Sequence, residues 1–279
     1  MIDGEFVLTG EDFARIARMV HEMAGIHLTD SKATLVYARL TKRLRALGLQ
    51  SFRDYCALVQ EERGADERAK MLAALTTNVT RFFREPHHFD HLRSSVLPRL
   101  LESARHGGRV RLWSAGCSTG QEPYTIALTI LELMPEAGNY DIRILASDVD
   151  TEVLEQARAA TYSANALDGV PSAIRGKWFR NDGRGQFQLA PQVTELVALR
   201  ELNLIGPWPM KNTFQVIFCR NVTIYFDQQT RDRVWARFAQ QLAPGGYLYI
   251  GHSERLGGSA AQVLEPCGVT AYRYGGKQS

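Results

Sequence analysis

A short turn containing glycine, close to two acidic residues, is the part of this chain best suited to hold a small molecule. The run Leu112–Gly120 reads LWSAGCSTG, an apolar strand-like segment that ends in a glycine-containing turn. Glycine lets the backbone approach a ligand that a Cβ would block, and sheets of alternating strands and helices bind nucleotides at the carboxyl end of their first strand. Because the run lacks the complete G-x-G-x-x-G motif, the turn alone is a weak indication of a cofactor site.

Asp148 strengthens this interpretation. The segment Ala146–Thr151 (ASDVDT) places an acid at the end of the second predicted strand, beside the first. A carboxylate there can accept hydrogen bonds from both hydroxyls of a ribose. A helix cap is the alternative, but Asp150 or Thr151 could serve that purpose and leave Asp148 free. The turn and the acid together favour a cofactor that contains adenosine, without separating NAD from S-adenosylmethionine.

Glu122 helps to separate these cofactors. It falls at the start of the predicted helix after the turn, where a helix N-terminus would bind the pyrophosphate of NAD and a carboxylate would repel it. An acid suits S-adenosylmethionine, which carries an ammonium and a sulphonium, although glutamate in a first helical turn is also favourable for structural reasons alone. Two further segments could contribute: Cys219–Phe226, with an amide and a phenol, and Thr76–Arg84, which is either an ordinary linker or a lid.

The elements that would position these residues differ between the two parts of the chain. From residue 11 to about residue 76, apolar residues recur at helical spacing and no strand pattern is found. The predicted helices are Glu11–Ala24, one from a Ser31 cap to Gly48, one capped by Ser51, and one opened by Asp66.

After Pro86, predicted helices alternate with predicted strands. The strands are Arg109–Ser114, Asp141–Ser147, Phe214–Cys219, Gly246–Gly251 and Val269–Tyr274. This alternation predicts an α/β fold, a doubly wound and mostly parallel sheet with helices on both faces. Two strand-like runs between Phe187 and Leu199 are interpreted as a small β-hairpin insertion. We therefore expect a helical domain over residues 1–76, a linker over 77–87 and an α/β domain over 88–279, with the insertion at about 176–200.

Composition indicates an ordinary globular protein. The 279 residues are 45% hydrophobic and 23% charged, and the net charge of +3 does not by itself imply a polyanionic partner. The four cysteines are too widely spaced for a zinc set or a disulfide scaffold. Acids at the N-terminus argue against a signal peptide, and no apolar run reaches the roughly 20 residues of a membrane span. We expect a soluble cytoplasmic protein with reduced thiols and no membrane insertion.

His87, His88 and His91 start a predicted helix, and His87 and His91 have a spacing that could share a metal ion. We expect no cysteine or acid to complete such a set. Surface or capping histidines are therefore expected, and no metal site.

Five segments, in this order, resemble the CheR chemotaxis methyltransferases: Thr76–Glu85 (TTNVTRFFRE), Trp113–Tyr124 (WSAGCSTGQEPY), Ala146–Thr151, Cys219–Phe226 (CRNVTIYF) and Gly251–Glu254 (GHSE). The run from Gly25 to Arg45 also resembles the helical domain of that family, so the resemblance covers nearly the whole chain. It implies a Rossmann-like domain that uses S-adenosylmethionine. It also implies methyl transfer to glutamate side chains of chemoreceptors for sensory adaptation, with S-adenosylhomocysteine as the product.

The resemblance further implies roles for individual residues. Arg84 and Tyr225 would lie nearest the substrate carboxylate, and Arg84 is expected to orient that group rather than activate it. Glu122 would hold the amino-acid end of the cofactor or adjacent groups, and Asp148 its ribose. The implied cofactor contacts are Asn78, Thr80, Arg84, Glu122, Asp148, Asn203 and Leu204 (beside the adenine), and Asn221 and Val222 (beside the methionine part).

The predicted helix between Ser31 and Gly48 contains basic residues and no acid. On a helical wheel Lys42 and Arg45 fall nearly opposite a cluster of leucines. Such a face can be simply solvated, can bind nucleic acid, or can bind an acidic helix. The resemblance favours the last, since receptor methylation segments are glutamate-rich helices. The residues expected to contact the receptor are Arg39, Lys42, Arg43 and Arg45.

Two features of the sequence narrow the range of partners that we expect. The loop Arg180–Gly185 is shorter than the glycine-rich loop with which some family members bind a receptor C-terminal peptide, so we do not expect that tether. No proline follows Asn221, whereas enzymes that methylate base amino groups usually carry an Asn/Asp-Pro-Pro-aromatic turn there, so nucleic acid is not the expected substrate. A cofactor-binding module without catalysis stays an alternative. We expect a monomer.

Overall fold

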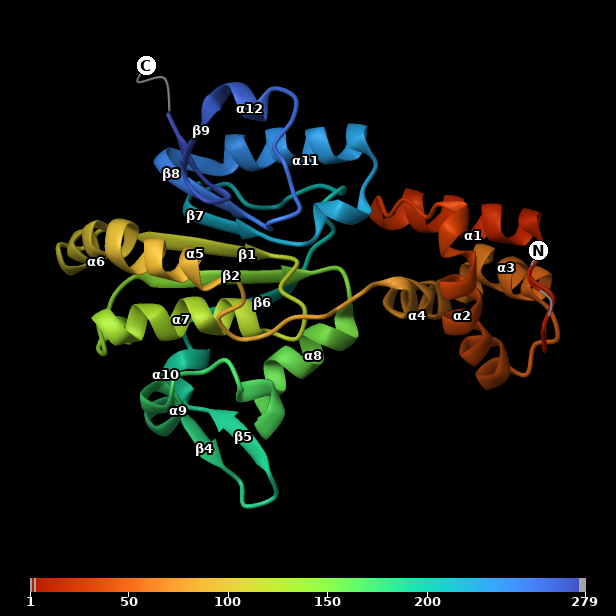
Figure 1. Ribbon diagram of the computed structural model, residues 1–279, viewed down its shortest axis with the longest axis horizontal. Helices are drawn as coiled ribbons and strands as arrows, with labels where there is room; N and C mark the ends of the chain where they lie inside the picture. The colour runs from red at the N-terminus through yellow and green to blue at the C-terminus, as the bar shows by residue number, and fades with distance from the viewer. Residues whose placement is uncertain (1, 3, 276–279) are drawn as a thin grey trace. The chain divides into compact units, whose positions relative to one another are not determined.

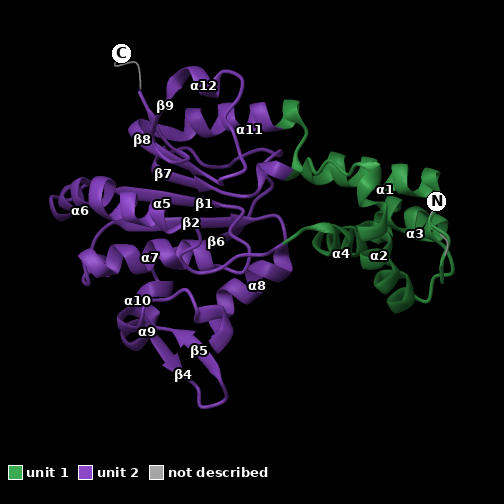
Figure 2. Ribbon diagram, in the orientation of Figure 1, with its two compact units in different colours: residues 1–77, 225–230 green, residues 78–224, 231–279 purple. Residues whose placement is uncertain are grey.

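The computed structural model describes residue 2 and residues 4–275. Two compact units divide the chain: unit 1 comprises Met1–Thr77 and Tyr225–Thr230, and unit 2 comprises Asn78–Ile224 and Arg231–Ser279 (Figure 2). Over the described part of the chain, none of the helices combines the length and the apolar character that crossing a lipid bilayer requires.

Unit 1 is built from helices: α1 (Gly10–Ala24), α2 (Ala33–Leu47), α3 (Phe52–Gln60) and α4 (Ala65–Leu75). Gly48 ends α2 in the left-handed conformation, with φ of 67°, and Ser51 caps α3 by accepting a hydrogen bond from the N–H of Asp54, as predicted. Ser31 does not cap α2. The chain enters this helix through a 3-10 turn, Asp30–Lys32, so Ser31 lacks the extended backbone that a cap requires.

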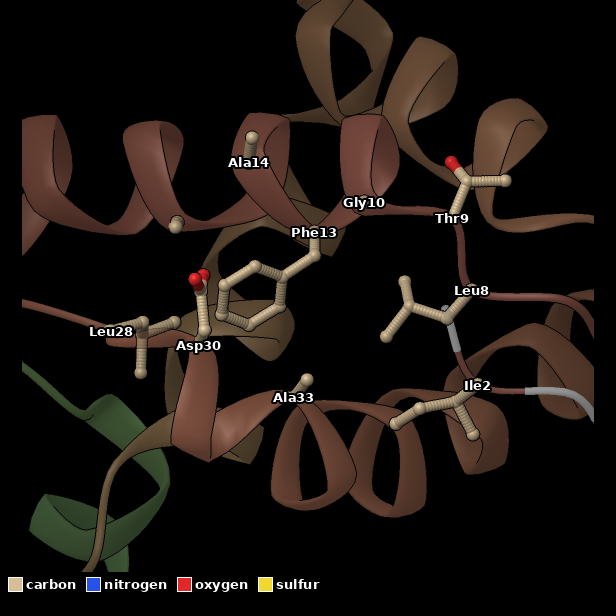
Figure 3. Close-up of a pocket in the computed structure, with 10 residues that line it drawn as sticks. Ile2, Leu8, Thr9, Gly10, Phe13, Ala14, Leu28, Asp30 and Ala33 are labelled. Carbon is tan, nitrogen blue, oxygen red and sulfur yellow. The ribbon is translucent and has the colours of Figure 1, made fainter.

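A pocket of about 630 Å³ lies within unit 1, between the segment before α1 and the start of α2. Figure 3 shows its apolar wall, to which Leu8, Phe13 and Leu28 contribute, with the carboxylate of Asp30 near it. The residues that line the pocket include none of the predicted cofactor contacts.

The described residues of unit 2 form a seven-stranded sheet in the order β6-β2-β1-β7-β8-β10-β9. Its strands are β1 (Val110–Ala115), β2 (Ile142–Asp148), β6 (Val197–Glu201), β7 (Phe214–Cys219), β8 (Leu242–Ile250), β9 (Leu264–Gly268) and β10 (Ala271–Tyr274). Strands β6, β2, β1, β7 and β8 run parallel to one another, and β10 is antiparallel to both of its neighbours, β8 and β9. The chain adds β2 and β6 on one side of β1 and β7 and β8 on the other, so the strand order reverses between β1 and β7, where such sheets bind ligands.

Both faces of this sheet are covered. The helices around it are α5 (Pro86–His91), a π-helical turn (Leu92–Val96), α6 (Leu97–Arg105), α7 (Gln121–Leu133), α8 (Thr151–Ala159), α11 (Gln228–Gln241) and α12 (Ala260–Val263). Leu112 of β1 shares a buried core with Ile126 of α7. Its neighbour Trp113 meets Phe238 of α11, with ring centroids 5.1 Å apart. Because successive residues of a strand point to opposite faces, α7 and α11 cover different faces (Figure 1). The predicted doubly wound fold is confirmed.

A second, three-stranded sheet lies within residues 161–189, in the order β3 (Thr161–Ser163), β5 (Gln186–Leu189), β4 (Phe179–Asn181). Helix α9 (Ser172–Trp178) lies between β3 and β4 in the sequence, and α10 (Pro191–Thr194) follows β5. The hairpin is therefore formed by β4 and β5. The expectation that both runs between Phe187 and Leu199 belong to it is wrong, because Val197–Glu201 pairs in parallel with β2 as the edge of the main sheet.

Candidate cofactor site at the ends of the central strands

The turn after β1 is shaped by backbone that only small residues adopt easily. Gly116 and Gly120 have φ values of 79° and 94°, and Ser118 between them has φ of 49°. The N–H groups of Gly116 and Cys117 both donate to the Ser147 carbonyl, at 2.8 and 2.9 Å. A Cβ added to Gly116 would lie 2.3 Å from Cγ2 of Val222. Glycine at this position therefore lets Val222 pack directly on the turn.

Asp148 ends β2 beside this turn and is 9% exposed. Its Oδ2 accepts a hydrogen bond from the Ser118 N–H at 2.8 Å, and its Oδ1 accepts one from the Asp150 N–H at 3.0 Å. Burial raises the pKa of the Asp148 carboxyl above its usual range, while these backbone N–H groups oppose the rise. As predicted, Asp150 rather than Asp148 caps α8, by accepting from the N–H of Glu152. The expectation that Asp148 is left free is wrong in detail, because each of its oxygens accepts from a backbone N–H group.

Asn78 joins the start of the linker to the same place. Its side-chain amide donates to Oδ2 of Asp150 at 2.8 Å, and its carbonyl accepts from the Ser118 hydroxyl at 2.9 Å. Asn78, the turn and Asp148 are thus brought together from three separate parts of the sequence. Thr80 and Arg84 follow on the same segment, and Arg84 donates from Nη1 to the Val79 carbonyl at 2.9 Å.

Glu122 lies in the first turn of α7, as predicted, and its side chain is 12% exposed. Oε1 accepts from the Ser114 hydroxyl at 2.7 Å, and Oε2 accepts from Nη1 of Arg220 at 3.1 Å. Burial raises the pKa of the Glu122 carboxyl, although Arg220 and Ser114 act in the opposite direction. The side chain is therefore an internal acceptor at the helix start, close to the end of β1.

Asn203 and Leu204 follow the edge strand β6. The N–H of Leu202 donates to the Asp148 carbonyl at 2.9 Å, which fixes this segment beside the end of β2. Asn203 accepts from the N–H of Ile205 at 3.1 Å, and the carbonyl of buried Leu204 accepts from Nη1 of Arg237 at 2.8 Å. The two residues predicted to flank the adenine thus lie next to the acid predicted to hold the ribose.

Asn221 and Val222 are held by Glu254, a residue to which the sequence reasoning gave no role. The Glu254 side chain accepts from the N–H groups of Asn221, Val222, Thr223 and Gly251 and from the Thr223 hydroxyl, at 2.6–3.1 Å. Glu254 is 1% exposed, and Asn221 has a left-handed φ of 60°. A buried carboxylate therefore fixes an otherwise unfavourable turn.

Tyr225 belongs to unit 1, where its carbonyl accepts from the N–H of His27 at 2.7 Å. Its proposed place near the substrate carboxylate stays a prediction from the sequence.

The basic residues of α2 are mostly engaged inside unit 1. Arg43 donates two hydrogen bonds to Glu67, at 2.9 and 2.7 Å, and Arg39 donates to the carbonyls of Thr76 and Ala74 at 2.6 and 3.2 Å. Glu67 is buried, with 6% of its surface exposed. Arg45 is exposed and pairs with Glu5, and Lys42 is also exposed.

The histidines differ from expectation in one respect. His88 is fully buried rather than at the surface, with Nε2 at 2.8 Å from Oγ1 of Thr270, and burial lowers its pKa to about 3. Within the described residues, the group that brings metal-binding atoms together is Glu85, His87 and His88, all within 4.8 Å of one another. The Glu85 carboxylate in this group already contacts the Arg220 guanidinium, at 3.3 Å.

Models of two protein domains match this chain. The CheR methyltransferase SAM-binding domain matches residues 78–273, and the CheR methyltransferase all-alpha domain matches residues 11–76. The chain belongs to the CheR methyltransferase family. S-adenosylmethionine is therefore its cofactor, and methyl transfer in chemotaxis its activity.

Relatives of this CheR chain match it over almost their whole length. A probable chemotaxis protein methyltransferase of Rhizobium etli is 54% identical over 92% of this chain and 97% of the relative. Chemotaxis protein methyltransferase 2 of Pseudomonas aeruginosa is 39% identical, covering 96% and 94%. The chemotaxis protein methyltransferase of Escherichia coli is 40% identical, covering 89% and 86%.

The acidic residues of this CheR chain fit S-adenosylmethionine. The cofactor offers two ribose hydroxyls, an ammonium and a positive sulphur, and Asp148 and Glu122 are buried carboxylates at neighbouring strand and helix ends. Burial disfavours the charged form of both, so a hydrogen-bond donor or a positive charge beside either would stabilise the carboxylate. The negatively charged phosphates of NAD would instead destabilise the carboxylate form of these side chains.

Sequence reasoning missed Arg220 and Glu85 as well as Glu254. Arg220 directly follows the last residue of β7, and strand ends at this edge carry the other site residues. This position at a strand end, just before the amide of Asn221, was the available signal.

Proposed function

We propose that this CheR enzyme transfers the methyl group of S-adenosylmethionine to glutamate side-chain carboxylates of chemoreceptors, forming methyl esters and S-adenosylhomocysteine. The observation that carries the proposal is how the carboxylates of the site are used. Glu254 accepts hydrogen bonds from a backbone turn, Asp148 from two backbone N–H groups, and Glu122 from Ser114 and Arg220. Groups held in this way serve as fixed acceptors. Because they act as hydrogen-bond acceptors rather than as bases, they suit a methyl-accepting substrate that is already deprotonated when it binds.

A glutamate side chain is such a substrate. Its unperturbed pKa is about 4.3, so it is ionised and nucleophilic at neutral pH. The cofactor supplies a methyl group on positively charged sulphur, and attack by the carboxylate neutralises both charges. The residues of this chain then have to align the carboxylate with the methyl group and exclude water.

Arg84 is proposed to orient the incoming carboxylate. A tight ion pair would lower its nucleophilicity, so the guanidinium should direct the group without holding it closely. Arg84→Ala should lower turnover by enzyme saturated with cofactor, measured with a receptor cytoplasmic fragment. Unchanged turnover under saturation would exclude this role.

Helix α2 is proposed to dock the glutamate-rich receptor helix. Lys42 and Arg45 are its exposed cations, and Arg45 pairs with exposed Glu5. Arg39 and Arg43 are less exposed and donate to the Thr76 carbonyl and to buried Glu67. This proposal therefore assigns most of the docking to Lys42 and Arg45. The turn between β4 and β5 is short, and the Asp182 N–H donates across it to the Gln186 carbonyl at 3.0 Å. This short turn is the reason for the prediction that no receptor tail peptide is tethered there.

A filter assay with tritium-labelled S-adenosylmethionine separates this function from its rivals. Receptor cytoplasmic fragments and nucleic acid are offered as acceptors, and the labelled product is treated with base. Label on receptor protein that is released as methanol supports glutamate ester formation. Base-stable label on nucleic acid would indicate a nucleic-acid methyltransferase, and cofactor binding without transfer would indicate a binding module.

A further inference from the structure

Arg220 joins three segments of unit 2 that are far apart in the sequence. Its side chain is 2% exposed. Nη1 donates to Glu122 of α7 at 3.1 Å, and Nη2 lies 3.3 Å from Oε2 of Glu85 in the linker. Nη2 also donates to the backbone carbonyl of Arg84. The guanidinium thus contacts the helix that carries one predicted cofactor contact and the linker that carries others.

The linker backbone at this point is unusual. Phe83 and Glu85, on either side of Arg84, have left-handed φ values of 53° and 57°. Residues other than glycine keep this conformation when surrounding contacts fix them. Here Arg220 contacts both the Arg84 carbonyl and the Glu85 carboxylate, and His252 lies 3.0 Å from the other Glu85 oxygen.

The charge of Arg220 also matters for Glu122. The buried cluster contains two carboxylates, Glu85 and Glu122, for one guanidinium. Burial raises the pKa of Glu122, the Glu85 charge raises it further, and Arg220 lowers it. Without Arg220, Glu122 would keep its hydrogen bond from Ser114 and Glu85 its contacts with His88 and His252. Both carboxylates would lose the guanidinium, and Glu122 would take up a proton at higher pH.

We propose that Arg220 is the positioning residue of the methyl-transfer site, which fixes the linker around Arg84 and presents the Glu122 carboxylate to the cofactor. It does so through two residues and does not itself need to touch the reacting atoms. The shape of arginine suits this work, because its planar fork can contact several acceptors at once, whereas lysine presents one compact charge. The inference rests on the proposed function, since it concerns the same site.

Arg220→Met and Arg220→Lys test the inference. In Arg220→Met, affinity for S-adenosylhomocysteine, measured by calorimetry, should fall about tenfold or more at neutral pH. The loss of affinity on acidification should also begin at a higher pH than in the wild type. Arg220→Lys should return that pH dependence toward the wild type, because it restores the charge, while kcat stays low because the Arg84 carbonyl and Glu85 are not both held.

Arg111→Met is the matched control. Arg111 also pairs with a carboxylate in unit 2, its Nη2 lying 2.6 Å from Asp141, but at the start of β1 rather than near its end. It should leave cofactor affinity and its pH dependence unchanged. If Arg220→Met does not fold, Glu85→Gln removes the charged linker contact while keeping Arg220. It should lower kcat, and the acid decline of cofactor affinity should begin at a lower pH than in the wild type, because the Glu85 charge that raises the pKa of Glu122 is lost.

The outcomes separate this inference from the proposed function. Wild-type enzyme that forms base-labile ester, together with Arg220 variants of unchanged affinity, pH dependence and kcat, would overturn the positioning role alone. Wild-type enzyme that binds S-adenosylhomocysteine but labels no receptor carboxylate would overturn the proposed function, whereas the altered binding of Arg220→Met would still be expected.

Discussion

Arginine is used differently at the strand ends of unit 2 and on helix α2 of unit 1. Arg220 is almost completely buried and contacts two carboxylates and a carbonyl. On α2, Arg45 has a side chain 58% exposed and a single carboxylate partner, Glu5, that is itself 48% exposed. Water and salt weaken an exposed pair of this kind. The buried cation therefore serves the interior of unit 2, while the exposed ion pair of Arg45 and Glu5 lies at the surface of unit 1.

Two carboxylates of unit 2 are used in the same way as Arg220. Glu254 and Asp148 are buried and hold particular backbone N–H groups. Changes at the strand ends should consequently affect folding and cofactor binding strongly, and changes on the exposed face of α2 should affect receptor binding with little effect on stability.

The largest effect is expected for Glu254→Ala. It removes the acceptor of four backbone N–H groups and one hydroxyl. Leaving such buried donors unpaired should reduce the free energy of unfolding by about 3 kcal/mol, measured by urea denaturation. Glu265→Ala, which changes an exposed glutamate of β9, is the control and should alter stability by less than about 0.5 kcal/mol. Equal effects of the two substitutions would remove the contrast between buried and exposed carboxylates.

Asp148→Asn should weaken S-adenosylhomocysteine binding by about tenfold or more, because a hydrogen bond to a charged group is worth about 1.5–3 kcal/mol. Asp141→Asn is matched to it, since Asp141 precedes the same strand at its other end and is 47% exposed on its side chain. Calorimetric titration of both variants provides the measurement. Wild-type affinity in Asp148→Asn would show that the ribose is not held there.

Cofactor affinity should also depend on pH. Asp148 and Glu122 must be ionised to act as full acceptors, and burial raises the pKa of each. Affinity for S-adenosylhomocysteine should therefore be constant near neutral pH and fall on acidification, starting above the ordinary carboxyl range of about pH 4. The stability of the free enzyme should change with pH in the opposite direction. The unfolded chain releases these two protons at lower pH than the folded chain does, so the contribution of the two groups to the free energy of unfolding falls as pH rises. Calorimetry between about pH 5 and pH 8 would detect the acid decline, and a flat profile would contradict it.

The smallest effect on the enzyme itself is expected from Lys42→Glu combined with Arg45→Glu. Stability should change by less than about 1 kcal/mol, as for exposed ion pairs, and cofactor affinity should stay unchanged. Binding of a receptor cytoplasmic fragment should weaken several-fold and lose its dependence on salt. Arg63→Glu, at an arginine of unit 1 outside α2 whose side chain is 76% exposed, is the control. Parallel loss of receptor and cofactor binding would point instead to misfolding.

Sequence reasoning predicted the parts of the structure that short-range patterns determine. The alternation of strands and helices gave the parallel sheet, and Asp148 could be separated from the helix cap because Asp150 stood two residues later. Ser31 failed as a cap because a 3-10 turn precedes α2. Strand β6 was misassigned because its partner, β2, is about 50 residues away in the sequence.

The cluster of charged side chains around Arg220 could not be predicted from short-range sequence patterns. Glu85, Glu122 and Arg220 meet only after the linker, α7 and the end of β7 are assembled. Nothing in the local sequence of Arg220 shows that it is buried. Buried His88 likewise has a distant hydrogen-bond partner, Thr270, which follows it by 182 residues.

The most direct test of the account is to locate the transferred methyl group by mass spectrometry of a receptor cytoplasmic fragment after reaction with S-adenosylmethionine and the wild-type enzyme. We predict the added mass of one methyl group on glutamate residues, removed by mild base and absent when Asp148→Ala replaces the wild type. A methyl group on another residue type, or modification that survives base, would contradict glutamate ester formation.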